Sequence, residues 1–202
     1  MSDRSFSDRV ANVRRTTDET DVEVTLGLDG DGDASVTTGI GFFDHMLELF
    51  ARHGSFDLEV RCEGDLEVDP HHSVEDVGIS MGKALREALG EKAHIDRYGT
   101  AHLPMDETLA RAVVDCSGRF YFHLEGTFSR ADVGDLPTEM VAHFWYSLAE
   151  HAGLNLHLDL IRGTNAHHQV EALFKASARA LKAAVRRRAD NASVPSTKGT
   201  LE

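Results

Sequence analysis

Apolar and polar residues alternate along several short stretches of the chain, which is the pattern of a strand with one buried face. In the first of these stretches Val22, Val24 and Leu26 alternate with mostly polar residues. The run Asp-Gly-Asp-Gly-Asp at 29–33 follows, and it predicts a turn into another short strand. Further strands are predicted at 57–60, 112–115, 120–124 and 155–158.

Other stretches repeat their apolar residues at the spacing of a helix. One such pattern stops at Gly90, which predicts a helix that ends at a glycine. Its apolar positions are Val74, Val77, Met81, Leu85 and Leu89. A shorter helix is predicted to pass through His45 and to end at Gly54. A last helix is predicted from about 167 to 188.

The two halves of the chain repeat each other. When residues 43–54 are written above residues 141–152, the histidines of the two stretches coincide. Farther along, residues 83–88 match residues 179–184. A series of matches in the same order indicates internal duplication. Each half is predicted to contain strands, a short helix, a strand and a long helix.

These elements predict an α+β fold that is duplicated within one domain, residues 1–190. The two pseudo-repeats are about 1–92 and 93–190. Each would form a sheet with helices on one face, and the two would pack with their helices between the two sheets. Residues 191–202 are predicted to form a tail that becomes ordered only when something docks on it.

Composition narrows the class of protein. The 202 residues are 41% apolar, which is typical of a globular chain, and the formal net charge of −13 argues against nucleic acid as a partner. No apolar run is long enough for a membrane span and no signal peptide opens the sequence, so we expect the protein to be located in the cytoplasm. The many acids and few lysines are typical of proteins from salt-loving organisms. Cys62 and Cys116 are expected to be buried free thiols.

The five-residue motif His-His-x-Val-Glu, which we call the histidine word, occurs twice, at 71–75 and 167–171. If His71 begins a helix, Glu75 lies four residues on and both side chains share one face, within reach of a single ion. His72 is rotated by about 100° from His71 and does not easily join the same ion. Each word therefore offers a bidentate pair in one direction and a single imidazole in another.

Two more histidines, His45 and His143, precede the two words at matching positions. The six imidazoles and two carboxylates divide evenly into two sites with three nitrogens and one oxygen each. Such mixed donors without thiolate favour open octahedral sites for Mn²⁺, or for Fe²⁺ or Co²⁺, over closed zinc sites. Asp44 and Asp76 are adjacent to ligands and are candidates to orient imidazoles. Which histidine joins which ion stays open.

Several short motifs of the sequence together resemble the imidazoleglycerol-phosphate dehydratase family. The resemblance covers nearly the whole chain, and the sequence does not depart from the family at any metal-ligand position. These motifs lie at 15–20, 44–47, 71–76, 115–119, 167–171, 174–176 and 196–199. The resemblance implies a fold of the ribosomal S5 domain 2 type and a manganese-dependent lyase of histidine biosynthesis. It would remove water from imidazole glycerol phosphate to give imidazole acetol phosphate. It also implies a shell of 24 subunits with active sites between subunits.

The resemblance also implies roles for particular residues, with two Mn²⁺ per subunit. The implied metal ligands are His45, His71, His72, Glu75, His143, His167, His168 and Glu171. The implied phosphate-binding groups are Arg97, Arg119, Lys175, Ser196 and Lys198. Glu19 matches a substrate-contacting acid, His53 matches a position near the substrate, and all the ligand histidines except His143 would also border the substrate.

The proton that must leave carbon in this dehydration is weakly acidic, because it lies beside an imidazole instead of a carbonyl. Two metal ions would act as Lewis acids and as a template. Glu19 is the candidate to transfer the proton. Glu75 and Glu171 are weaker catalytic candidates, because binding to metal lowers their basicity. A guanidinium at Arg97 or Arg119 suits a phosphate dianion.

Two other readings of the same ligands remain open at this point. A dinuclear hydrolase could use a metal-bound hydroxide on a phosphate ester, and it would release free phosphate. A non-catalytic shell that stores metal would bind ions without a substrate pocket, so Glu19, Arg97, Arg119 and Lys198 would be freely replaceable.

Overall fold

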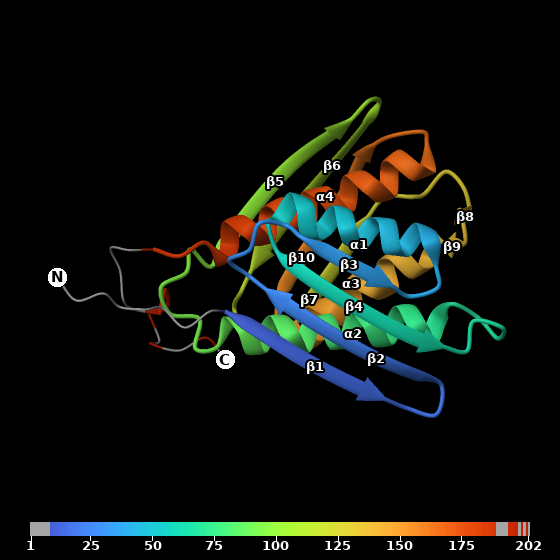
Figure 1. Cartoon of the computed structure of the whole chain (residues 1–202). Coiled ribbons are helices and arrows are strands. Elements are labelled where there is room, and N and C mark those ends of the chain that lie inside the picture. The colour runs from blue at the N-terminus through green and yellow to red at the C-terminus, as the bar shows by residue number, and fades with distance from the viewer. Residues whose placement is uncertain (1–8, 189–193, 198, 200, 202) are drawn as a thin grey trace.

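The first half of the chain forms a four-stranded sheet, in a computed structural model that describes residues 9–188, 194–197, 199 and 201. The strand order is β1-β2-β4-β3, with β3 parallel to β4 and the other pairs antiparallel (Figure 1). The strands are β1 (Val10–Thr16), β2 (Thr20–Gly27), β3 (Ala34–Thr37) and β4 (Asp57–Gly64). Val22, Val24 and Leu26 of β2 are buried, as the alternation of the sequence predicts.

The second half forms another four-stranded sheet, in the order β5-β6-β10-β7. Here β7 is parallel to β10 and the other pairs are antiparallel, so order and direction repeat those of the first sheet. The strands are β5 (Tyr98–Met105), β6 (Thr108–Asp115), β7 (Tyr121–Glu125) and β10 (Asn155–Arg162). The predicted internal duplication is therefore present in the fold.

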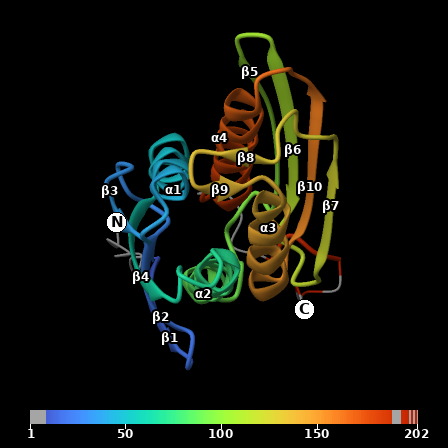
Figure 2. The ribbon, with the colours of Figure 1, turned by 90° about the vertical axis from the view of Figure 1, so that its right-hand side faces the viewer.

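Four helices fill the space between the two sheets, which confirms the predicted α+β architecture (Figure 2). They are α1 (Gly41–Gly54), α2 (His71–Leu89), α3 (Glu139–Ala152) and α4 (Ala166–Val185). α1 packs against α4, and α2 packs against α3. Each pair thus joins one helix of the first half to one helix of the second.

Glycines allow α2 and α3 to approach closely. A Cβ atom on Gly82 would lie 2.6 Å from the carbonyl oxygen of Leu148, and one on Gly78 would lie 3.0 Å from that of Phe144. Atoms so close would overlap, so a larger residue at Gly82 would force the helices apart. This close contact helps to set how the first histidine word on α2 faces His143 on α3.

The ends of the helices differ in part from the prediction. α2 ends at Gly90 as predicted, but the left-handed residue that ends α1 is Ser55 (φ 52°), and Gly54 is the last helical residue. α4 ends at Val185 rather than near 188, because the chain turns to an extended conformation at Arg186. A short hairpin that the sequence does not predict, β8 (Asp132–Val133) and β9 (Leu136–Pro137), precedes α3.

Much of the C-terminal tail lies outside the described residues, so its predicted ordering on docking stays a prediction. Among the described residues no helix has the length and apolar character to cross a membrane. Cys62 and Cys116 are buried and free, as predicted. Burial raises the pKa of Cys62 to about 11 and that of Cys116 to about 12, so both thiols are unreactive at neutral pH.

Candidate functional site

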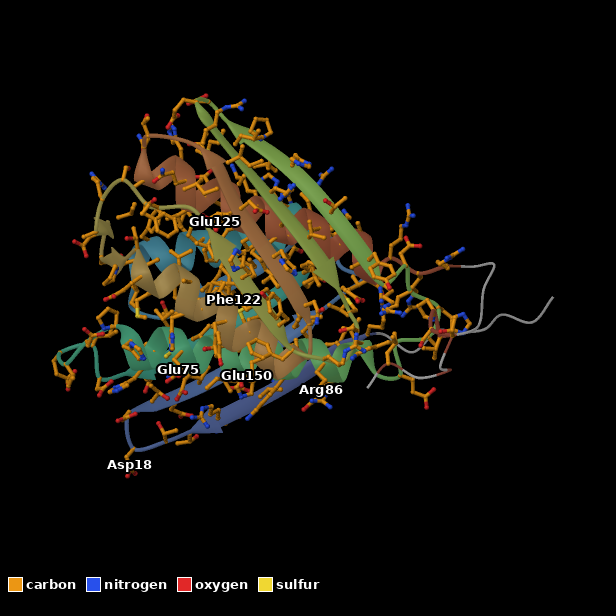
Figure 3. The ribbon with its side chains drawn as sticks, turned by 180° about the vertical axis from the view of Figure 1, so that it is seen from behind. Asp18, Glu75, Arg86, Phe122, Glu125 and Glu150 are labelled. Atoms are coloured by element: carbon orange, nitrogen blue, oxygen red, sulfur yellow. The ribbon has the colours of Figure 1, made fainter. Side chains whose placement is uncertain are left out.

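The first histidine word meets the lone histidine of the other half. His71 and Glu75 lie on the first turns of α2, and His143 lies on α3. Nε2 of His143 is 3.2 Å from Oε1 of Glu75, and the rings of His71 and His143 have their centroids 4.4 Å apart. Figure 3 shows Glu75 on α2 toward the same end of the molecule as Asp18 in the β1–β2 turn. We call this group the α2–α3 cluster.

The second word forms the reciprocal group, which we call the α1–α4 cluster. His167 and Glu171 lie on α4 and His45 lies on α1. Oε2 of Glu171 is 3.0 Å from Nε2 of His167 and 3.9 Å from Nε2 of His45. Each cluster therefore combines a word from one half with a single histidine from the other half.

Local sequence fixes where the two helices that carry the words begin. Asn165 precedes α4, and its side-chain oxygen accepts a hydrogen bond of 2.9 Å from the backbone N–H of His167. Asp69 accepts the equivalent bond of 2.7 Å from the N–H of His71. These bonds satisfy N–H groups that a helix start leaves without partners. At α1 the carboxylate of Asp135, from the β8–β9 hairpin, accepts from the first two N–H groups instead.

Both clusters fit a divalent transition-metal ion. Each offers two imidazole nitrogens and one carboxylate oxygen, and within each cluster these atoms lie within 4.8 Å of one another. Nε2 of His143 is buried and makes no hydrogen bond to a described residue, although Glu75 is close. A buried polar atom of this kind is costly unless something binds it, and a metal ion would do so.

Neighbouring side chains stabilise the negative charge of Glu171. Burial alone would raise the pKa of Glu171, but a hydrogen bond and the positive charge from Lys175, together with His167, leave it below the ordinary value. Glu171 is therefore ionised at neutral pH and available as a ligand. Lys175, predicted to bind phosphate, lies one helical turn from this carboxylate.

His72 and His168 lie outside both clusters, as the rotation of adjacent helical residues predicts. Nδ1 of His72 is 3.1 Å from both carboxylate oxygens of Asp65. Nδ1 of His168 is 2.8 Å from Oε2 of Glu107. These hydrogen bonds raise the pKa of both imidazoles. Within this chain, each ion would have three ligands from its cluster, and the third imidazole predicted for it does not converge on it.

The prediction that Asp44 and Asp76 orient imidazoles is wrong. Asp44 accepts hydrogen bonds from the backbone N–H and the hydroxyl of Thr38, where it stabilises the start of α1. Asp76 is buried and accepts bonds of 2.8 Å from Arg15 and 2.5 Å from Thr20. Both carboxylates hold the backbone and the first sheet in place.

The carboxylates that do orient imidazoles, Asp65 and Glu107, were missed by the sequence reasoning. Asp65 gives no signal, because it lies in a loop of unpredicted shape. Glu107 could have been found, because the turn Asp-Glu-Thr that contains it repeats the turn that contains Glu19. Its pKa is held well below the ordinary value by the hydrogen bond with His168 and by backbone N–H groups.

Lys175 lies beside the α1–α4 cluster, but Arg97, another predicted phosphate-binding residue, lies at the other end of α4. Both terminal nitrogens of Arg97 are engaged, one with Asp115 at 3.1 Å and the other with the carbonyl oxygen of Pro195 at 2.8 Å. The backbone N–H of Arg97 donates to the carbonyl oxygen of Ala184, which is about 25 Å along the helix from His167. Arg119 and Ser196 lie in the segments after β6 and beside Pro195, and Lys198 lies outside the described residues.

Glu19 and His53 lie nearer to the clusters. Glu19 is in the β1–β2 turn, and its side chain is 54% exposed with Oε1 3.6 Å from Nε2 of His72. His53 is in the last turn of α1. Burial, followed by the positive charges of Lys175 and Arg179, lowers the pKa of His53. His53 is therefore neutral at pH 7.

Comparison with known proteins identifies the family of the chain. The family model of imidazoleglycerol-phosphate dehydratase matches residues 38–181. An imidazoleglycerol-phosphate dehydratase from Salinibacter ruber is 68% identical over 201 residues, and the match covers 100% of both chains. A histidine biosynthesis bifunctional protein from Stenotrophomonas maltophilia is 55% identical over 193 residues, which are 96% of this chain and 53% of that protein.

The fold is also that of a solved relative. The crystal structure of imidazoleglycerol-phosphate dehydratase from Staphylococcus aureus superposes with a TM-score of 0.81 at 41% identity, covering 88% of this chain and 99% of that one. The chain therefore belongs to the imidazoleglycerol-phosphate dehydratase family, as its sequence motifs predict.

Proposed function

We propose that this chain catalyses the metal-dependent dehydration of imidazole glycerol phosphate to imidazole acetol phosphate, a step of histidine biosynthesis. The observation that carries the proposal is the pair of reciprocal clusters, one on α2 and α3 and one on α1 and α4. Membership of the dehydratase family supports the substrate and the reaction. Packing alone does not require two matching sets of imidazole and carboxylate where the two halves meet, so a ligand for these groups is the simpler explanation.

Mn²⁺ is the proposed ion, with two per subunit. The α2–α3 cluster would hold one and the α1–α4 cluster the other, and His72 and His168 would complete the sites from neighbouring subunits. When bound, these ions supply Lewis acidity for the departure of the hydroxyl group. In the same proposal the ligand histidines other than His143 border the substrate.

The separation of functional groups supports active sites that are shared between subunits. Arg97 lies about 25 Å along α4 from His167, a distance that a small phosphate ester does not span. His72 and His168 lie outside the clusters of their own chain and contact Asp65 and Glu107 instead. If each site takes its cluster from one subunit and the outward imidazole and phosphate-binding groups from others, both facts are explained. We propose the closed shell of 24 subunits for this assembly.

The chain's own residues supply proton transfer and substrate binding. Glu19 would take the proton from the carbon adjacent to the one that bears the leaving hydroxyl group, and it would return a proton to the carbon that has lost the hydroxyl group when the enol becomes the ketone. Its exposed carboxylate in a turn is accessible to a substrate that approaches from outside the subunit. Arg97, Arg119, Lys175, Ser196 and Lys198 are the proposed phosphate-binding groups.

The direct test is to identify the product and the assembly. Purified protein with Mn²⁺ should convert imidazole glycerol phosphate into a ketone that has lost one water and kept its phosphate, as followed by mass spectrometry. Elemental analysis should find two Mn²⁺ per chain, and light scattering should find 24 subunits. Release of free phosphate would indicate a hydrolase instead. Two bound ions without turnover would indicate a metal-storing shell, and a fully active monomer would contradict shared sites.

A further inference from the structure

The two β-hairpin turns at matching positions of the halves have the same sequence. Asp18-Glu19-Thr20 connects β1 to β2, and Asp106-Glu107-Thr108 connects β5 to β6. Each glutamate lies beside the second histidine of the word in its own half, Glu19 beside His72 and Glu107 beside His168. Glu107 is therefore the structural counterpart of the proposed proton-transfer residue.

The two glutamates nevertheless make different contacts. Oε2 of Glu107 is 2.8 Å from Nδ1 of His168. Its other oxygen accepts hydrogen bonds from the backbone N–H groups of Asn165 at 2.8 Å and Thr164 at 3.1 Å. Among the described residues, the carboxylate of Glu19 has only the 3.6 Å approach to His72, outside hydrogen-bond distance. One carboxylate is held on both oxygens and the other is open to a ligand.

A difference in loop length explains why the roles diverge. Six residues separate β4 from His71, and the first of them, Asp65, holds Nδ1 of His72. Only four residues separate β10 from His167, and none of these four is acidic. The second half therefore has no loop carboxylate for His168, and Glu107 occupies that place from the adjacent turn.

We propose that Glu107 is a positioning residue that sets the tautomer and direction of His168, an inference that rests on the proposed function. By accepting a hydrogen bond from Nδ1–H, Glu107 leaves Nε2 of the neutral ring with its lone pair free for an ion. Asp65 does the same for His72, and this releases Glu19 for proton transfer. Two turns with the same three residues thus serve two purposes.

The test variant is Glu107→Gln, because one oxygen of Glu107 accepts from backbone N–H groups and the other contacts His168, so the two contacts can be changed separately. The backbone N–H groups at Thr164 and Asn165 need an acceptor, so the amide oxygen of glutamine would face them and keep the loop intact. The amide NH₂ would then face Nδ1 of His168 and donate to it. The neutral ring would have to carry its proton on Nε2, where that proton blocks metal binding.

The measurement is Mn²⁺ binding to metal-free protein by equilibrium dialysis with elemental analysis, alongside thermal unfolding. In Glu107→Gln the affinity for one of two ions should fall about 10- to 100-fold, a typical cost of losing an outer hydrogen bond to a metal-binding histidine. The melting temperature of the metal-free protein should stay within about 2 °C of wild type. Turnover should be recovered at correspondingly higher Mn²⁺.

Two matched variants separate positioning from other effects. Glu19→Gln should keep wild-type affinity for both ions, and Glu125→Gln, a 74% exposed side chain at the end of β7, should change neither affinity nor turnover. If Glu107→Gln binds both ions as wild type does, the inference is wrong. If wild-type protein itself binds no Mn²⁺, the metal part of the proposed function is wrong, and the two failures are therefore distinguishable.

Discussion

The two halves of this chain share strand order, helix order and the histidine word, yet they differ in which carboxylate holds the second histidine of the word. In the first half the loop after β4 supplies Asp65, and in the second half the β5–β6 turn supplies Glu107. The comparison teaches that a duplicated fold conserves positions more strictly than roles. A change of two residues in loop length is enough to move a contact from one element to another and to free a side chain for chemistry.

The largest effect is expected from Glu19, the carboxylate that only the first half leaves open. Glu19→Gln should lower turnover about 10²- to 10⁴-fold, because it removes the proposed proton-transfer group. Steady-state kinetics with saturating Mn²⁺ measures the loss. The neighbouring Asp18→Asn should remain within about twofold of wild type. Turnover of Glu19→Gln within about tenfold of wild type would remove the proposed asymmetry of function between the turns.

The next test asks whether the two clusters are equivalent. His143→Ala and His45→Ala each remove one imidazole from a cluster and should each weaken one of the two bound Mn²⁺, by at least about 100-fold, because losing a ligand should cost more than losing its hydrogen-bond partner. Equilibrium dialysis should find one retained ion of near wild-type affinity in each single variant. Loss of both ions in either variant would mean that the clusters bind cooperatively as one unit.

The smallest effect concerns the helix pairs. Gly82 lies where α2 meets α3, and its counterpart on α4 at the equivalent offset is Ala178. Gly82→Ala should destabilise the protein by about 1–3 kcal/mol, because the added Cβ overlaps the backbone of Leu148. Thermal unfolding should show a decrease of roughly 2–12 °C. Ala178→Gly is the control and should cost only about 1 kcal/mol. An unchanged melting temperature for Gly82→Ala would show that the two pairs tolerate equal spacing.

Much of the fold follows from the sequence because its patterns are local. Alternation around Val24 predicts β2, helical spacing through Met81 predicts α2, and the aligned histidines predict two equal units. The short β8–β9 hairpin escapes prediction, because two-residue strands show no periodicity. Ser55 also escapes it, because a serine rarely adopts the left-handed conformation that ends α1.

The sequence predicts which residues of the site share a helix face, but it does not predict which residues of the two halves meet. The four-residue spacing from His71 to Glu75 indicates a shared face, whereas the meeting of Glu75 with His143 depends on how α2 crosses α3. Asp76 follows Glu75 in the sequence, and this adjacency predicts a role beside the ligands. Its side chain instead accepts a hydrogen bond from Arg15 of the first sheet. Long-range contacts of this kind depend on packing, which the local sequence does not encode.

The reciprocal origin of the clusters bears on how such a chain could have arisen. A half-length ancestor with one sheet and two helices would carry a word and a lone histidine on separate helices, so a single copy could not bring them together. Two copies paired about a two-fold axis would form both triads at once. Fusion of the two genes would then have turned an equilibrium between separate copies into a permanent covalent arrangement, after which each copy was free to specialise.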